Sequence, residues 1–310
     1  MMDGLILVQK PKGMTSHDII ARIRKILKIK KAGHFGTLDP SATGLLLVAV
    51  GKATRLFPYY LDRSKTYEGQ IRLGYATDTY DTEGIPSAIE TKSYPDEATL
   101  KERMAKFIGE IDQIPPPYSA KKYKGEALYK RVRAKKEYEL KPARVYIHYF
   151  KLKKYAPPLL DFTAKCSSGT YMRSLAHDLG QDLGCGAHLE RLARTEIGEF
   201  HIGESHTLAE IEEMHTSGQK GGFLRPIENL LSDLPRITVG SQHASLIQNG
   251  REFFPDNVLV DPPCDSVMTG EKSAKKDIVR IFDAQGKFLA LAKKSRENDS
   301  LHPFLVFTDK

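Results

Sequence analysis

The 310-residue sequence has few cysteines and no long apolar run. Its three cysteines, Cys166, Cys185 and Cys264, are odd in number and far apart, which argues against a disulfide framework and for a reducing compartment. No apolar run approaches the roughly 20 residues that a membrane-spanning helix requires. The N-terminus lacks the basic start and apolar core of a signal peptide. We therefore expect a soluble, cytoplasmic protein.

The common motifs that bind cofactors or metal ions are also missing. Leu46 stands where a phosphate-binding loop ending at Gly51-Lys52 would need its first glycine. Leu189 stands where a dinucleotide-binding turn beginning at Gly184 would need its third glycine. No His-Glu-x-x-His, Cys-x-x-Cys or Gly-x-Ser-x-Gly motif occurs, which argues against a catalytic zinc and a nucleophilic-serine turn. We expect chemistry performed by side chains alone, with no cofactor and no metal.

Positive charge is concentrated in two parts of the chain. The formal net charge is +8 and the isoelectric point is about 9.1. Residues 1–60 carry a net charge of +7 and residues 121–154 carry +10, which leaves −9 for the remainder. Such blocks favour a polyanionic partner such as nucleic acid, although solvated surfaces can have the same composition.

The periodicity of apolar residues predicts an α+β fold. A helix is expected after Thr15, which begins a capping-box pattern with Asp18. A second helix is expected to begin at Thr99, with Leu100, Met104 and Phe107/Ile108 facing inward. The apolar pattern around Leu192 is typical of a residue in the core of a helix. A further helix is expected at Thr170–Leu183. Strands are expected at Leu5–Val8, Leu45–Val50, from Tyr67 onward, Val145–Tyr149 and Leu160–Cys166.

A domain boundary is expected near Leu234-Pro235, which divides the chain into residues 1–235 and 236–310. An exposed, partly helical insertion at about 113–141 carries most of the second basic block. After the boundary, a hairpin around Asp283-Ala284-Gln285-Gly286 and a last strand at Pro303–Phe307 predict a small β-rich domain.

The strongest candidate for catalysis is Asp39, in the segment Gly33-His34-Phe35-Gly36-Thr37-Leu38-Asp39-Pro40-Ser41-Ala42-Thr43-Gly44. An isolated Asp-Pro pair is usually a simple turn, but the density of special residues here is unusual. The segment resembles the signature G-H-x-G-T-L-D-P-x-A-x-G of bacterial TruB-type tRNA pseudouridine-55 synthases, with every fixed position filled.

Other segments resemble the same family, in the same order along residues 5–195. They include Lys10-Pro11-Lys12-Gly13-Met14-Thr15-Ser16, Lys65-Thr66-Tyr67, Gln113–Lys122, Ser168–Leu175 and Leu183–His188. The resemblance implies a mixed, mostly antiparallel sheet with flanking helices. It also implies that residues 113–141 are an RNA-binding insertion and that residues 236–310 form a PUA-like domain, although these C-terminal residues match weakly.

The resemblance implies a site of six residues. Asp39 is the essential carboxylate, which acts as a nucleophile at C1′ or on the pyrimidine ring, or starts a glycal route. Arg173 pairs with this aspartate, and Tyr67 stacks on the target base. The pocket is completed by Tyr171 and Leu192, and His34 fills the stack that flipped nucleotides vacate. By pattern alone Arg173 could instead contact phosphate, and Tyr67 or His34 could be structural.

The implied activity is isomerisation of uridine 55 in the tRNA T-loop to pseudouridine, by base flipping and without a cofactor. The implied partner is the T-arm of tRNA, bound by a monomer without a guide RNA, an obligate protein partner or a membrane. Three alternatives stay open. They are a guide-dependent relative of archaeal and eukaryotic type, a non-catalytic RNA-binding or RNA-folding module, and a glycoside hydrolase, for which no second carboxylate can be named.

Overall fold

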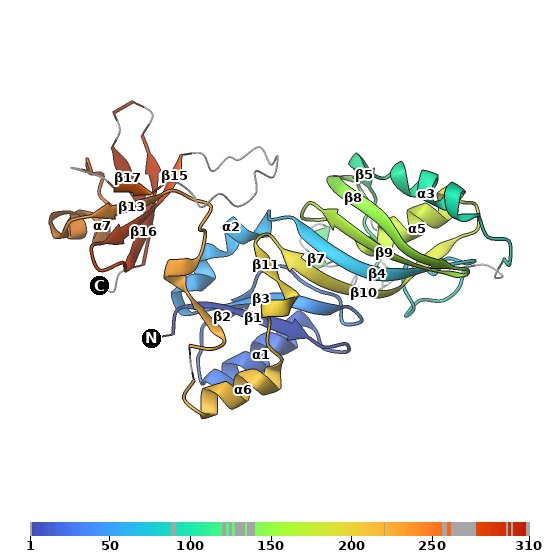
Figure 1. The fold of residues 1–310 in the computed structure, drawn as a ribbon, viewed down its shortest axis with the longest axis horizontal. Coiled ribbons are helices and arrows are strands. Elements are labelled where there is room, and N and C mark those ends of the chain that lie inside the picture. The colour runs from blue at the N-terminus through green and yellow to red at the C-terminus, as the bar shows by residue number, and fades with distance from the viewer. Residues whose placement is uncertain are drawn as a thin grey trace. The chain divides into compact units, whose positions relative to one another are not determined.

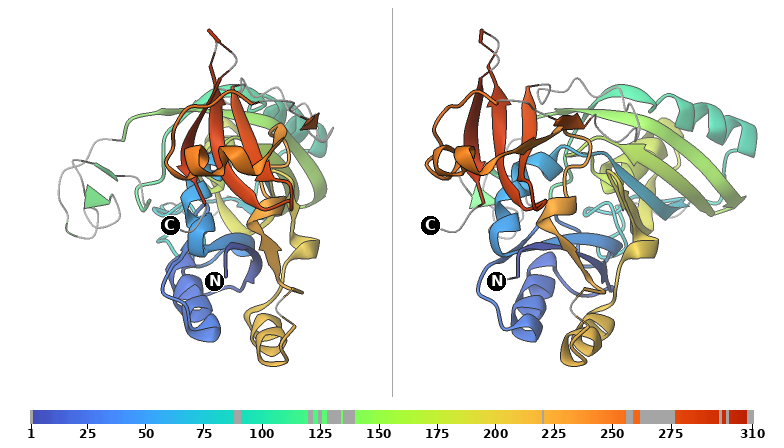
Figure 2. Two further views of the ribbon diagram at one scale, coloured as in Figure 1. Left: turned by 90° about the vertical axis from the view of Figure 1, so that its left-hand side faces the viewer. Right: turned by 60° about the vertical axis from the view of Figure 1, so that its left-hand side comes forward.

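The computed structural model describes residues 2–87, 91–119, 122–123, 126–127, 134, 140–219, 221–255, 259–261, 277–295, 297–298 and 300–307. The chain forms two compact units, whose elements are labelled in Figure 1 and seen from two further sides in Figure 2. The larger unit comprises Leu7–Val48 and Leu56–Gly218, and the smaller comprises Met1–Ile6, Ala49–Arg55 and Gln219–Lys310. The C-terminal part of the smaller unit begins at Gln219 in this division, so a domain boundary after residue 235 remains a prediction.

A mixed, mostly antiparallel sheet with the strand order β1-β3-β10-β4-β9-β8-β5 runs through the larger unit, as expected. Strand β10 is parallel to β3 and antiparallel to β4, and each pair from β4 to β5 is antiparallel. The strands are β1 (Gly4–Lys10), β3 (Thr43–Val50), β10 (Ala187–Ile197), β4 (Lys65–Leu73), β9 (Leu159–Cys166), β8 (Ala143–Ala156) and β5 (Gly109–Gln113), with the short strands β2 (Ala32–His34) beside β3 and β11 (Phe200–His201) beside β10.

Helices of the larger unit pack on this sheet and on one another. Helices α3 (Glu97–Ala105) and α5 (Met172–Asp182) share an apolar core with β4, β8 and β9 that contains Phe150 and Phe162. Helix α1 (Ser16–Leu27) lies beside α6 (Leu208–Thr216), as Figure 1 shows. The described part of the chain also contains the short helix α2 (Phe57–Leu61) and the 3-10 turns Gly51–Leu56 and Ile202–Glu204. The turn Gly51–Leu56 lies mostly in the smaller unit.

The structure confirms most of the expected elements and corrects three details. The capping box of Thr15 and Asp18 is present at the start of α1. Helix α3 begins two residues before Thr99, because Asp96 is its N-cap and accepts a hydrogen bond from the Thr99 amide at 2.7 Å. Ile108 is 46% exposed and does not face inward. Leu192 lies on strand β10, since pairing with β3 and β4 outweighs the helical pattern of its neighbours.

The smaller unit contains the predicted β-rich sheet, with the order β14-β13-β15-β16-β17. The expected hairpin is formed by β15 and β16, which pair from Ile278↔Lys293 to Phe282↔Phe288. Strand β12 (Leu224–Pro226) pairs separately with the start of β1. The other elements are β13 (Arg236–Val239), β14 (Leu259–Asp261), β15 (Ile278–Asp283), β16 (Phe288–Lys294), β17 (Leu301–Val306), α7 (Ala244–Gln248) and the 3-10 turns Ile227–Asn229 and Ser241–His243.

Most of the predicted insertion at 113–141 lies outside the described residues, so its partly helical character stays a prediction. Within it, β6 (Lys122–Tyr123) and β7 (Glu126–Ala127) form an antiparallel pair. Among the helices in the described ranges, none combines the length and hydropathy that crossing a membrane would require.

Candidate active site

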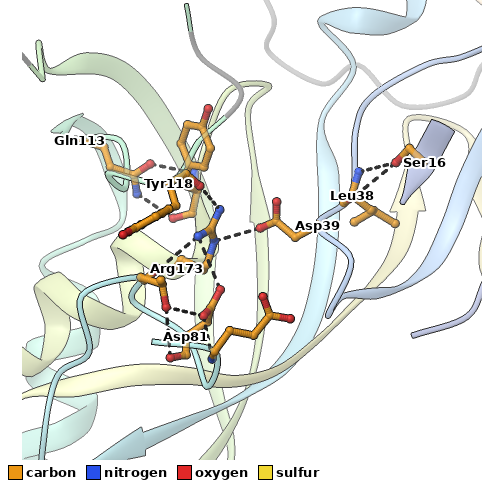
Figure 3. Close-up of polar contacts among 10 residues, drawn as sticks. Ser16, Leu38, Asp39, Asp81, Gln113, Tyr118 and Arg173 are labelled. Atoms are coloured by element: carbon orange, nitrogen blue, oxygen red, sulfur yellow. Dashed lines mark hydrogen bonds and ion pairs between the residues drawn. The ribbon is translucent and has the colours of Figure 1, made fainter. Parts of the chain in front are cut away.

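The backbone around Asp39 is held in place by the segment that precedes and begins α1. The Oγ of Ser16 accepts a hydrogen bond from the Leu38 amide at 3.0 Å, and the Gly13 amide donates to the Pro40 carbonyl at 2.8 Å. Figure 3 shows the Ser16–Leu38 contact beside Asp39. The residues on both sides of Asp39 are therefore fixed by contacts far away in the sequence.

Lys10 is a second anchor of this loop, and it was not among the predicted site residues. Its side chain is fully buried, and its Nζ donates to the carbonyls of Pro11, Met14 and Pro40 at 3.0, 2.6 and 3.3 Å. Burial lowers the pKa of Lys10 to about 8, an effect that the nearby charge of Asp39 opposes. Its position in the segment Lys10–Ser16, which resembles the family, was the available sequence signal.

Arg173 forms an ion pair with Asp39, as the resemblance implied. The Arg173 Nε lies 2.9 Å from Asp39 Oδ2, without the alignment of a hydrogen bond. The Nη1 and Nη2 of Arg173 donate to the carbonyls of Thr79 and Tyr118 at 3.1 and 3.0 Å. The Arg173 side chain is 7% exposed and that of Asp39 41%, so a buried guanidinium orients a carboxylate that solvent can reach.

Asp81 is a second carboxylate at this guanidinium, and it was not among the predicted site residues. Its Oδ2 lies 3.5 Å from Arg173 Nη1. Its Oδ1 accepts hydrogen bonds from the Thr79 hydroxyl at 2.6 Å and the Glu83 amide at 3.0 Å. Figure 3 shows Arg173 between the two aspartates. The acidic turn Asp78–Gly84 was the signal in the sequence that could have indicated Asp81. The burial of the Asp81 side chain, however, depends on contacts with α5.

A cavity of about 680 Å³ collects five of the six predicted site residues. The residues come from the loop before β3, from strands β4 and β10, and from the start of α5. They are Asp39, Tyr67, Tyr171, Arg173 and Leu192. The cavity therefore combines a carboxylate with two aromatic rings, which suits a pyrimidine base.

The two tyrosines of the cavity are held in different ways. Tyr67 is 9% exposed, and burial raises its pKa, an effect that neighbouring Arg194 partly opposes. Burial also raises the pKa of Tyr171. The Gln113 side chain fixes the backbone of Tyr171, because its Oε1 accepts from the Tyr171 amide at 2.8 Å and its Nε2 donates to the Tyr171 carbonyl at 3.1 Å.

His34 does not line this cavity. Its half-buried ring lies edge-on to His17, with 5.4 Å between the ring centroids. Burial lowers the pKa of His34 to about 4, so its imidazole is neutral at neutral pH. The role of His34 at a vacated base stack stays a prediction.

A second cavity of about 570 Å³ also reaches Asp39 and shares Arg173 and Leu192 with the first. Its other polar residues include Lys12, Glu68, Asp161 and Arg191. Within the described part of the chain, no group of three or more His, Cys, Asp or Glu residues is arranged to hold a metal ion.

Comparison with known proteins identifies the family. Residues 24–172 match the family described as "TruB family pseudouridylate synthase (N terminal domain)", and residues 173–232 match "tRNA pseudouridylate synthase B C-terminal domain". The tRNA pseudouridine synthase B of Dehalococcoides mccartyi is 37% identical over 306 residues, 99% of this chain and 97% of that protein. The protein of the same name from Solibacter usitatus is 41% identical over 252 residues, 81% of this chain and 86% of that protein.

Solved structures support the same fold. A chain in a Cbf5-Nop10-Gar1 complex superposes with a TM-score of 0.72 and 25% identity, covering 98% of this chain and 85% of that chain. A chain of an H/ACA RNP bound to a substrate RNA containing 2′-deoxyuridine has a TM-score of 0.71 and 24% identity, covering 99% and 85%. With this fold and these relatives, the chain belongs to the TruB family of pseudouridine synthases and is an isomerase.

Proposed function

We propose that this enzyme converts uridine 55 in the T-loop of tRNA to pseudouridine, with Asp39 as the catalytic carboxylate. The observation that carries the proposal is the ion pair between Asp39 and Arg173 at the wall of a cavity that also contains Tyr67, Tyr171 and Leu192. The relatives named tRNA pseudouridine synthase B support tRNA as the substrate.

The proposed reaction rearranges bonds within one nucleotide. The target uridine is flipped out of the T-loop, at a cost of a few kcal/mol of stacking, and its base enters the cavity against Tyr67. The C1′–N1 bond breaks and a C1′–C5 bond forms, while the proton leaves C5 and N1 gains one. The oxidation state does not change, so this reaction requires no redox cofactor. Asp39 acts either as a nucleophile, at C1′ or on the ring, or by starting a glycal route.

We propose that a monomer binds the T-arm of tRNA, without a guide RNA or an obligate protein partner. Basic residues support RNA binding by the larger unit. The exposed side of α1 carries Arg22 and Lys25, and the exposed Lys28 is the C-cap residue of this helix. The exposed residues of β8 include Lys151, Lys153 and Lys154. These side chains are suited to phosphate contacts, because Lys and Arg supply most of the affinity for the nucleic-acid backbone.

To test this proposal, the purified protein is incubated with a full tRNA transcript and, separately, with an isolated T-arm stem-loop, without other proteins. Pseudouridine is then mapped at each position of both RNAs. We expect pseudouridine at position 55 in both RNAs. Asp39→Asn should abolish its formation and leave tRNA affinity nearly unchanged, because the substitution keeps the shape of the side chain and removes its charge.

Other outcomes would identify the alternative functions. Modification only when a guide RNA and further proteins are added would favour a guide-dependent enzyme. Binding of tRNA without any conversion would favour an RNA-binding module. Residual activity of Asp39→Asn together with lost binding would contradict the catalytic assignment of Asp39.

A further inference from the structure

Arg194 on strand β10 is the largest fully buried side chain among the described residues, with 1% of its surface exposed. No carboxylate in the described ranges lies within ion-pair distance of its guanidinium. A buried cation without a counter-ion is costly unless other polar groups surround it. Arg194 must therefore be stabilised by the polar groups that its guanidinium contacts.

The contacts of the Arg194 guanidinium converge on the loop that carries Asp39. Its Nη2 donates to the Gly36 carbonyl at 3.1 Å and its Nη1 to the Thr37 carbonyl at 3.3 Å. Its Nε donates to the Leu45 carbonyl at 2.9 Å, at the start of β3. One side chain thus holds the loop on both sides of Asp39, and three carbonyl dipoles compensate part of its charge.

The same guanidinium also reaches the aromatic side of the cavity. Arg194 lies opposite Tyr67 in the antiparallel β4–β10 register, and its charge opposes the rise that burial causes in the pKa of Tyr67. Both residues line the cavity that contains Asp39. Arg194 therefore connects the backbone of the aspartate loop with the ring on which the target base is proposed to stack.

We propose that Arg194 is a positioning residue of the pseudouridine reaction, which fixes the Asp39 loop and Tyr67 relative to each other so that both face one flipped uridine. The proposal rests on the proposed function. It assigns to Arg194 an effect on the rate of the chemical step at saturating tRNA, because a loosely held reacting group loses the advantage of preorganisation. It does not assign a contact with the substrate.

Two substitutions and one matched control test this role. Arg194→Lys keeps the charge but replaces three separate nitrogens, each of which donates to its own carbonyl, by a single ammonium nitrogen. Arg194→Met removes both the charge and the donors. Arg280→Met is the control, since Arg280 is also a buried arginine, 8% exposed, that donates to two carbonyls, of Leu234 and Leu230, in the smaller unit.

We expect Arg194→Met to lower the single-turnover rate at saturating tRNA by about 100-fold, with Kd for tRNA within about 3-fold of wild type. Arg194→Lys should lose about 10-fold. Arg280→Met should lower the thermal midpoint without changing this rate. A folded Arg194→Lys or Arg194→Met enzyme with the wild-type rate overturns the proposal, as does an equal rate loss in Arg280→Met. Where Arg194→Met does not fold, Arg194→Lys decides.

Hydrogen exchange separates this proposal from the proposed function, because it needs no activity. Amides of residues 35–45 should exchange at least about 10-fold faster in both Arg194 variants than in the wild type or in Arg280→Met. Unchanged exchange in this loop overturns the positioning role. A wild-type protein that forms no pseudouridine at position 55 refutes the proposed function, while the exchange measurement still decides whether Arg194 holds the loop.

Discussion

Arg173 joins Asp39 to Asp81: its Nε lies 2.9 Å from Asp39 Oδ2, and its Nη1 lies 3.5 Å from Asp81 Oδ2. Only Asp39 is substantially open to solvent, with 41% of its side chain exposed against 9% for Asp81. The buried carboxylate is therefore placed to orient the guanidinium, and the guanidinium orients the accessible carboxylate.

Asp81→Asn should slow catalysis without preventing RNA binding. The amide keeps the size of the carboxylate but removes the charge that holds Arg173, so we expect a loss of about 10- to 100-fold in the single-turnover rate and little change in tRNA affinity. Asp182→Asn is the control. Asp182 is the last residue of α5, the helix that carries Arg173, and it pairs with Arg103 and with the exposed Lys106. Equal rates for Asp81→Asn and wild type would show that Asp81 does not support Arg173.

Gly44→Ala should destabilise the protein by more than backbone strain alone. Gly44 has a φ of +105°, and a Cβ there would lie 2.3 Å from the Arg194 carbonyl oxygen. Gly13→Ala is the matched control, since Gly13 has a φ of +89° but no atom within 4 Å of the added Cβ. Strain of this type costs roughly 1–3 kcal/mol. Denaturant unfolding should show a clearly larger loss for Gly44→Ala, and similar losses would argue against the close approach.

Asp178 on α5 should make stability depend on pH. Burial raises the pKa of Asp178 to about 6, whereas in an unfolded chain this carboxyl titrates near its ordinary value of 3.8. The native state then binds the extra proton between these values, so this group's contribution to stability is present at low pH and is lost as pH rises through 6. Asp178→Asn should raise the thermal midpoint relative to wild type above pH 6, with the difference vanishing near pH 4. A constant difference across this range would contradict the assignment.

Charge reversal on β8 should weaken tRNA binding through its electrostatic part. Replacing the exposed Lys151, Lys153 and Lys154 by Glu removes phosphate contacts, so the affinity should fall and its dependence on salt concentration should become less steep. Reversal of Lys101 on α3 and of Lys106, the C-cap residue of this helix, is the control for a general change in net charge. An unchanged salt slope in the β8 variant would show that these lysines do not contact RNA.

The sequence by itself determined the features that depend on neighbours along the chain. The capping box at Thr15 and the hairpin of residues 278–293 follow from local turn and cap chemistry, and the structure contains both. The glycine-rich segment around Asp39 identified the family before any distance was known. Its motif could do so because the special backbone and the carboxylate are adjacent in the chain.

Only the tertiary structure decided which groups surround that carboxylate. Leu192 is on a strand because β10 is held between β3 and β4, although its local pattern is helical. Asp81 and Arg194 reach the site through contacts between segments far apart in sequence. Periodicity and motif spacing describe one segment at a time, so the burial of a single polar side chain and the carbonyls that it meets become definite only when the strands pair.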